Sequence, residues 1–185
     1  TATVCDEVYR SLMGMRWQPS LQIIPHYESE PKYIDALVES IEKKINEINW
    51  KPELIISSYH GIPKSYFDKG DPYQCYCQKT TRLIKEQFKE IDINTTFQSR
   101  FGPQEWLKPY TDKTLEKLPN EGYKNILVIC PGFASDCVET LEEISIQGRD
   151  SFISNGGKNF DLIPCLNDSS DHIDLFENLI KKYLV

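Results

Sequence analysis

One histidine and two glutamates have the types and spacing that metal or proton chemistry requires. His60 follows a short apolar run and precedes Gly-Ile-Pro, a place where a parallel strand would deliver a side chain into a cleft. Glu139 and Glu143 are four residues apart, so they share one face of a predicted helix. Neutral imidazole accepts a proton near neutral pH, and carboxylates bind hard or borderline cations. Two such ligands form an open site, which suits a metal that is handed on better than it suits structural zinc.

Each of these residues also has a plainer interpretation. A hydrogen-bonded loop histidine would explain His60, and a solvated acidic face would explain the glutamates, with Gln147 on the same face and Glu142 beside it. Residue type and spacing leave both interpretations open. The other histidines are interpreted as a surface residue before an acidic loop, His26, and as part of the first turn of the last helix, His172.

The composition predicts a soluble globular chain with one hydrophobic core. Apolar residues make up 39% and charged residues 26% of the 185 residues. The net charge of -7 argues against a nucleic-acid partner, which would require clustered Lys and Arg. No apolar run approaches the roughly 20 residues that a membrane-spanning helix needs.

The beginning of the chain and its cysteines indicate a cytoplasmic location. Residues 1–7 have neither a basic region nor an apolar core, so we expect no secretory signal, and the missing initiator Met suggests a piece of a longer chain. Without such a signal, the six cysteines are expected to be reduced thiols. Cys130 and Cys165 are interpreted as buried strand residues.

Short strand-like runs alternate with amphipathic helical stretches, which predicts an α/β fold. The expected strands are 21–25, 54–59, 94–99, 125–130 and 160–164, and the expected helices are 3–15, 31–48, 71–89, 111–118, 136–153 and 168–184. This order predicts a parallel sheet of four to five strands with helices on both faces. Ligands bind at the carboxyl ends of such strands, which selects the loops at 60–63, 99–102 and 131–136.

Aromatic residues cluster in and near these loops. They are suited either to the core or to the walls of a site for a flat apolar ligand. The members of the cluster are Tyr59, Phe101, Trp106, Tyr110 and Phe133.

Five motifs together resemble the ferrochelatase family, in its order and spacing, over residues 1–185. They are His60-Gly-Ile-Pro with Gly70-Asp-Pro-Tyr, Phe97-Gln-Ser-Arg-Phe-Gly, Trp106-Leu-Lys-Pro-Tyr-Thr-Asp, Pro131 to Glu143, and Pro164-Cys-Leu-Asn-Asp. The bacterial type is the nearer likeness. The resemblance implies a lyase of haem biosynthesis that inserts ferrous iron into protoporphyrin IX or coproporphyrin and releases two protons.

The same resemblance implies a chelatase-like fold of two Rossmann-like α/β lobes with the porphyrin between them, of which this chain would be the C-terminal half. Residues 1–155 match the second lobe. Residues 156–185 match its final strand and the C-terminal helix, which is expected to pack against the first lobe.

The resemblance also assigns roles to individual residues. His60 and Glu139 match a paired site, in which His60 would accept a proton and Glu139 would receive protons or deliver metal. Glu143 matches a second carboxylate on a path for the metal. Gln147 stands where some members have a third carboxylate, and Cys137 stands where others have a histidine. The positions that match the porphyrin pocket are Tyr59, Ser99, Arg100, Trp106 and Phe133.

No organic cofactor is implied, but some family members bind a 2Fe–2S cluster. Such a cluster needs four ligands. Cys75 and Cys77 are candidates for two of them, and free thiols are the alternative.

The expected partners are porphyrin, ferrous iron and the chain's own N-terminal lobe, with peripheral contact at the inner face of the membrane and a homodimer as further candidates. Two other functions stay open. One is a chelatase for another tetrapyrrole or metal, and the other is a non-catalytic lobe that binds tetrapyrrole or metal. Without the surface that normally covers its last helix, we expect the chain to self-associate.

Overall fold

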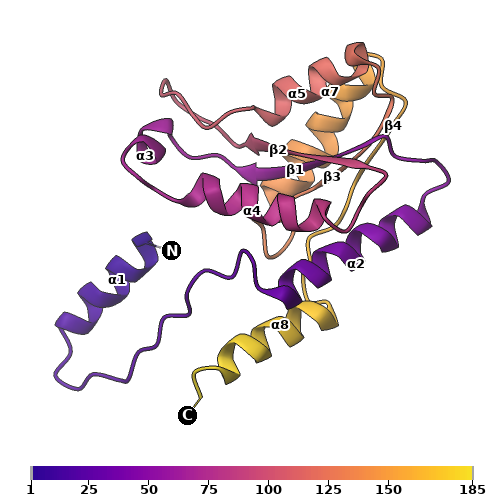
Figure 1. Cartoon of the computed structure of the whole chain (residues 1–185). Coiled ribbons are helices and arrows are strands. Elements are labelled where there is room, and N and C mark those ends of the chain that lie inside the picture. The colour runs from indigo at the N-terminus through magenta and orange to yellow at the C-terminus, as the bar shows by residue number, and fades with distance from the viewer. Residues whose placement is uncertain (1, 185) are drawn as a thin grey trace.

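The computed structural model describes residues 2–184, and its centre is a four-stranded parallel sheet (Figure 1). The strands are β1 (Leu54–His60), β2 (Asp92–Gln98), β3 (Asn125–Ile129) and β4 (Asn159–Leu162). Their order in the sheet is β2-β1-β3-β4, and all three pairings are parallel. The predicted α/β class is therefore confirmed.

Helices cover both faces of this sheet (Figure 1). One face carries α2 (Pro31–Glu47), α4 (Tyr73–Lys85) and α8 (Ser170–Lys181). The other carries α5 (Thr111–Lys117) and a long interrupted helix made of α6 (Val138–Thr140), η2 (Leu141–Gly148) and α7 (Arg149–Ser154). The remaining elements are α1 (Ala2–Met13), α3 (Lys64–Asp68) and the 3-10 turn η1 (Leu118–Glu121).

The central strands β1 and β3 are buried along almost all of their length because both faces of the sheet are covered. On β1, Ile55 packs into the core beneath α2, α4 and α8, whereas Leu54 and Ile56 pack into the core beneath α5 and α7. Cys130 and Cys165 are buried as predicted, although they lie just beyond the ends of β3 and β4.

The strand predicted at residues 21–25 is wrong. Residues 14–30 run as an irregular connection between α1 and α2 (Figure 1). Ile24 packs against the core beneath α2, so its apolar character reflects burial of a loop side chain. Pro19 and Pro25 also lack the N–H that a strand ladder requires.

The start of the predicted helix at 71–89 also needs correction. Asp71 behaves as a cap, because its Oδ1 accepts a hydrogen bond from the Tyr73 N–H at 2.9 Å, but α4 begins at Tyr73 and ends at Lys85. The preceding α3 was not predicted. On the last helix, Ser169 is the N-cap and His172 lies in the first turn, as expected.

The predicted helix at 136–153 contains a π-helical segment, η2, which its sequence did not indicate. π-Helical turns are rare and are found frequently at functional sites. Gly148 closes the segment where it meets α5, and a Cβ there would lie 3.0 Å from Leu115 Cδ1. A glycine at this position therefore permits the close approach of η2 and α5.

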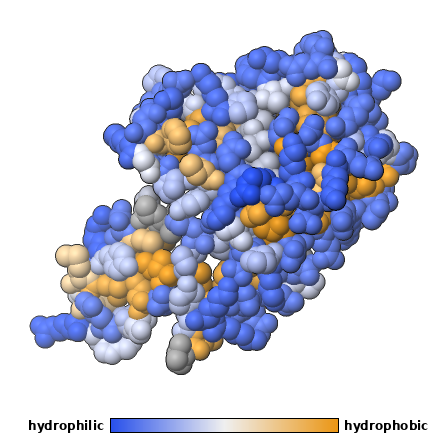
Figure 2. All heavy atoms as spheres, in the orientation of Figure 1, coloured by the Kyte–Doolittle hydropathy of each residue, from blue (hydrophilic) through white to orange (hydrophobic). Residues whose placement is uncertain are grey.

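Helix α1 lies apart from the sheet and exposes apolar side chains, which Figure 2 shows gathered over it. The exposed residues on and just after it include Val4, Tyr9, Met13, Met15 and Trp17. Among residues 2–184, no helix combines the length and the apolar character needed to cross a bilayer.

Candidate functional site

His60 is the last residue of β1, at the carboxyl edge of the sheet as predicted. Its Nδ1 lies 2.6 Å from the carbonyl oxygen of Gly61, which can only accept, so Nδ1 carries the proton. The lone pair of Nε2 is then free to accept a proton or bind a metal ion. The imidazole centroid lies 6.3 Å from the rings of both Trp106 and Phe133.

A close approach of backbones fixes this arrangement. A Cβ on Gly61 would lie 3.0 Å from the carbonyl oxygen of Gln98 and 3.1 Å from Trp106 Cε3. The Trp106 indole N–H donates to the carbonyl oxygen of Phe101 at 3.0 Å, and the indole is only 6% exposed. Trp106 is thus a rigid wall that offers little more than its edge.

Glu139 lies in α6, at the start of the interrupted helix, and is partly exposed. A hydrogen bond from the Cys137 thiol is the main reason that the pKa of the Glu139 carboxyl lies below its usual range, a backbone hydrogen bond adds to this, and protonation of His60 would lower the pKa further. The carboxylate is therefore ionised at neutral pH. His60 and Glu139 thus lie close enough for a charge on one to affect the pKa of the other, and their pairing stays a prediction.

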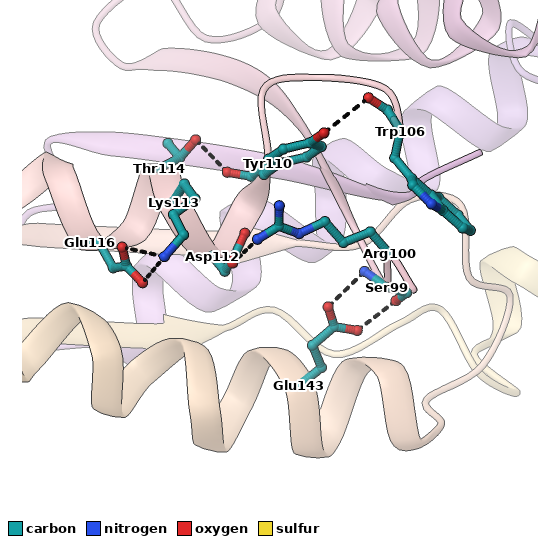
Figure 3. A network of polar contacts seen from close by, with 9 residues as sticks. All are labelled: Ser99, Arg100, Trp106, Tyr110, Asp112, Lys113, Thr114, Glu116 and Glu143. Carbon is teal, nitrogen blue, oxygen red and sulfur yellow. Dashed lines mark hydrogen bonds and ion pairs between the residues drawn. The ribbon is translucent and has the colours of Figure 1, made fainter. Parts of the chain in front are cut away.

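Glu143 has a different environment (Figure 3). Its carboxylate accepts hydrogen bonds from the Ser99 N–H at 2.7 Å and the Ser99 hydroxyl at 2.5 Å, and Gln98 Nε2 lies 3.4 Å away. Ser99 has a φ of 61°, the left-handed region that non-glycine residues rarely adopt. The carboxylate predicted as a second metal ligand is thus bound by the loop that follows β2.

The remaining predicted residues on this helix point to solvent. Gln147 and Glu142 are exposed, and Gln147 Nε2 donates to Glu142 Oε1 at 3.1 Å. The three residues predicted to share one helix face therefore differ. The Glu139 carboxylate is open, the Glu143 carboxylate is hydrogen-bonded to Ser99, and the Gln147 amide is hydrogen-bonded to Glu142.

The turn that enters α6 is held by a reciprocal pair of hydrogen bonds. The Asp136 N–H donates to Asn167 Oδ1, and Asn167 Nδ2 donates to Asp136 Oδ2, both at 2.8 Å. The carbonyl oxygen of Asn167 lies 2.7 Å from Nδ1 of the buried His172. This clamp joins the start of the glutamate helix to the start of α8.

Two other predicted pocket residues already have partners within the chain. Tyr59 is 3% exposed, and its hydroxyl lies 3.0 Å from the hydroxyl of Thr81. The guanidinium of Arg100 lies 4.1 Å from the centroid of the Tyr110 ring and donates to Asp112 at 2.6 Å, so it is already paired (Figure 3).

A cleft of about 800 Å³ opens beside His60, on the side of α4. Its size is in the range of small-molecule sites.

Tyr73, which was given no role from the sequence, lines this cleft and donates through its hydroxyl to the carbonyl oxygen of His60 at 2.8 Å. Burial raises the pKa of Tyr73, so this hydroxyl stays protonated. In the sequence, the one indication of a role for Tyr73 was its place directly after Gly70-Asp-Pro. The other aromatic residues that line the cleft are His26, Tyr27, Tyr33, Tyr59, Tyr66 and Tyr76.

The two candidate cluster cysteines do not converge. They are two residues apart on α4, which separates their side chains by about 200° around the helix axis. Cys75 is exposed, whereas Cys77 is buried, and burial raises the pKa of its thiol to about 12. Cluster ligation requires thiolates. In this conformation the two thiols therefore lie on different sides of α4, and their role as cluster ligands stays a prediction. Among residues 2–184, no three His, Cys, Asp or Glu side chains gather to hold a metal ion.

Comparison with known proteins identifies the family. The family model described as Ferrochelatase matches residues 1–184. The chain is 54% identical to a ferrochelatase of Rhizobium etli (strain CIAT 652) over 186 residues, which cover 100% of this chain and 54% of that protein. It is also 54% identical to a ferrochelatase of Rhizobium meliloti (strain 1021), covering 100% of this chain and 55% of the relative. A ferrochelatase of Brucella ovis (strain ATCC 25840 / 63/290 / NCTC 10512) is 50% identical, and the match covers 100% of this chain and 53% of that protein.

The chain thus spans about half the length of these curated relatives. The match extends over almost all of its residues, including those around His60 and Glu139. The chain belongs to the ferrochelatase family.

Proposed function

We propose that the protein to which this chain belongs inserts ferrous iron into a porphyrin, forming haem and releasing two protons. The observation that carries the proposal is the state of His60. Its Nε2 has a free lone pair, its ring centroid lies 6.3 Å from those of Trp106 and Phe133, and a charge on it would affect the ionised carboxylate of Glu139. The two Rhizobium relatives are named ferrochelatases, which supports the same reaction.

The reaction needs a base beside the macrocycle. Iron forms bonds to the pyrrole nitrogens as two N–H bonds break, and both protons must leave. His60 Nε2 accepts one pyrrole proton, and the resulting imidazolium keeps its Nδ1–H hydrogen bond to Gly61, while the second pyrrole proton passes to the Glu139 carboxylate. The negative charge of Glu139 attracts ferrous iron and also stabilises the imidazolium.

Rigid walls assist the same step. The nitrogen lone pairs point out of the porphyrin plane only when the macrocycle is bent. Trp106 is fixed by its indole hydrogen bond and by Gly61, so it does not yield to a flat ligand. Binding against such a wall would favour the bent form as ground-state strain.

The test is anaerobic ferrous-iron insertion, followed by porphyrin absorbance. The full-length protein, its His60→Ala variant and the 185-residue chain are assayed with protoporphyrin IX and with coproporphyrin. We expect the full-length protein to turn over and His60→Ala to lose at least about 100-fold in kcat, the usual contribution of a positioned base. Porphyrin binding without insertion by the full-length protein would overturn the proposal and favour a binding role.

We also propose that the apolar side chains of α1 are covered in the full-length protein by its N-terminal lobe. The support is their exposure here and the length of the relatives. The 185-residue chain alone should then form dimers or larger species by light scattering, because an exposed apolar face favours association. A monomer at all concentrations would contradict this.

For the cell, we propose a cytoplasmic location with peripheral contact at the inner face of the membrane. Exposed aromatic residues outside α1, namely Tyr66, Phe67 and Phe101, support such contact. Fractionation of cell extracts tests the location. Flotation of the full-length protein with anionic vesicles tests the contact, and failure to float would contradict it.

A further inference from the structure

Gln98 is a buried polar residue that the proposed mechanism does not use. It is the last residue of β2, lies opposite His60 in the parallel pairing, and is 3% exposed. We propose that Gln98 is a positioning residue that sets the separation between His60 and the helix of Glu139 and Glu143. This inference rests on the proposed iron insertion.

The orientation of the Gln98 amide follows from its neighbours. Nε2 lies 2.7 Å from the carbonyl oxygen of Glu139 and 3.4 Å from Oε2 of Glu143. Both of these oxygens can only accept, so the amide must turn its NH₂ toward the helix. Its oxygen then faces the sheet, where it accepts from the Ser58 hydroxyl at 2.7 Å and from the Cys130 thiol at 3.5 Å.

The backbone of the same residue holds the loop of His60. The Gly61 N–H donates to the carbonyl oxygen of Gln98 at 2.8 Å. Gln98 therefore contacts the residue after His60 through its main chain and the residue Glu139 through its side chain. A single residue thus links the two halves of the proposed site, with a hydrogen bond at each end.

The length of this side chain thus determines how far the glutamate helix lies from His60. The adjacent residue strengthens the link, because Ser99 binds Glu143 through both its N–H and its hydroxyl. A hydrogen-bond donor is needed on the helix side, so an apolar side chain of the same length would fill the space without holding the helix. A displacement of about 1 Å from reactive geometry can reduce a rate about 100-fold.

The test compares Gln98→Met with Thr96→Val in the full-length protein. Thr96 lies on the same strand, is 1% exposed, and its hydroxyl lies 2.8 Å from that of Thr111 in the same polar network. Thr96→Val therefore removes a buried hydrogen bond without touching the glutamate helix. Three quantities are measured: kcat, the KM for porphyrin, and hydrogen exchange of the amides in residues 138–148.

We expect Gln98→Met to lower kcat 10- to 100-fold, to leave the porphyrin KM within about threefold, and to accelerate exchange in residues 138–148. Thr96→Val should leave kcat and this exchange near wild type. An unchanged kcat in Gln98→Met, or an equal loss in Thr96→Val, would overturn the inference. If Gln98→Met does not fold, Gln98→Asn is judged by the same criteria, since its shorter amide cannot reach both partners. A wild-type protein without insertion activity would refute the proposed function, while the exchange data would still report on the link.

Discussion

Two parts of one helix, four residues apart, carry the same side chain in opposite situations. Around Glu139, the carboxylate is partly exposed, accepts a hydrogen bond from the Cys137 thiol and is coupled to His60. Around Glu143, the carboxylate is bound by the N–H and the hydroxyl of Ser99. The first is open to a metal ion or a proton, whereas the second fastens the loop after β2 to the π-helical turn.

The difference shows that spacing finds candidates, while their neighbours assign the roles. Helical spacing placed Glu139 and Glu143 on one face, and nothing in that pattern separated them. An ionised carboxylate with free lone pairs can exchange ligands quickly, whereas one with several donors must lose those bonds first. Within the proposed function, Glu139 is therefore the candidate for chemistry, whereas Glu143 has a structural role in this conformation.

The largest expected effect comes from Glu139→Gln, which keeps the size of the side chain and removes its charge. We expect kcat for iron insertion to fall by about 100-fold or more, because the proton acceptor or metal-attracting charge is lost. The melting temperature should not change, since Glu139 is partly exposed and its bonds are local. The assay is anaerobic insertion by the full-length protein, with thermal unfolding measured in parallel.

Glu142→Gln is the matched control for this substitution. Glu142 lies on the same helix and is exposed. Among residues 2–184, the one side-chain polar contact of its carboxylate is with Gln147. It should keep kcat within about twofold, as is usual for exposed sites. An equal loss of kcat in Glu142→Gln would mean that the helix contributes through its overall charge, and the contrast between open and bound carboxylates would fail.

Glu143→Ala should affect stability more than Glu139→Gln does. It removes the acceptor of two short hydrogen bonds from Ser99, and bonds to charged groups contribute about 1.5–3 kcal/mol each when broken singly. Because both bonds share one carboxylate, we expect a total loss of about 2–3 kcal/mol in the free energy of unfolding. Urea titration of the full-length protein measures it, and a loss below about 0.5 kcal/mol would show that the contact is not maintained in solution.

Much of the fold followed from the sequence, for reasons that the exceptions make clear. The four strands were placed correctly because short strand-like segments alternate with helical patterns, and the apolar runs that begin β1 and fill β3 are typical of strands buried on both faces. The run at 21–25 looked the same, but it has no neighbouring strand, and pairing is a tertiary property. The π-helical segment was missed because its residues suit an α-helix equally well, and its bonds to Gln98 and Ser99 come from another part of the chain.

The candidate site was predictable where a general rule applied. His60 was found because ligands bind at the carboxyl ends of parallel strands. Gln98 and Tyr73 received no role, because a polar residue at a strand end and a tyrosine in a first helical turn have many ordinary explanations. Only the contacts to Glu139 and to the His60 carbonyl distinguish them.

Substitutions of Ser99 test whether the residue that binds the Glu143 carboxylate has a strained backbone conformation. Its φ of 61° costs a residue with a Cβ about 1 kcal/mol relative to glycine. Ser99→Ala loses the hydroxyl donor and keeps the strain, whereas Ser99→Gly loses the same donor and relieves it. Urea titration should therefore find Ser99→Gly more stable than Ser99→Ala by about 0.5–1 kcal/mol. The reverse order would indicate that the left-handed conformation is not adopted in solution.

The smallest expected effect is a shift in pH dependence from Cys137→Ala. The Cys137 thiol is the main cause of the lowered pKa of Glu139, so removing it should raise that pKa toward its usual value. Glu139 must be ionised to act, and protonation removes activity as the pH falls, so a higher pKa moves the acid limb of kcat/KM to higher pH. Cys137→Ser keeps a donor and should hold the limb near the wild-type position. If both variants follow the wild-type profile, the acid limb belongs to another group. The Cys137 thiol would then not be what gives Glu139 a different environment from Glu143.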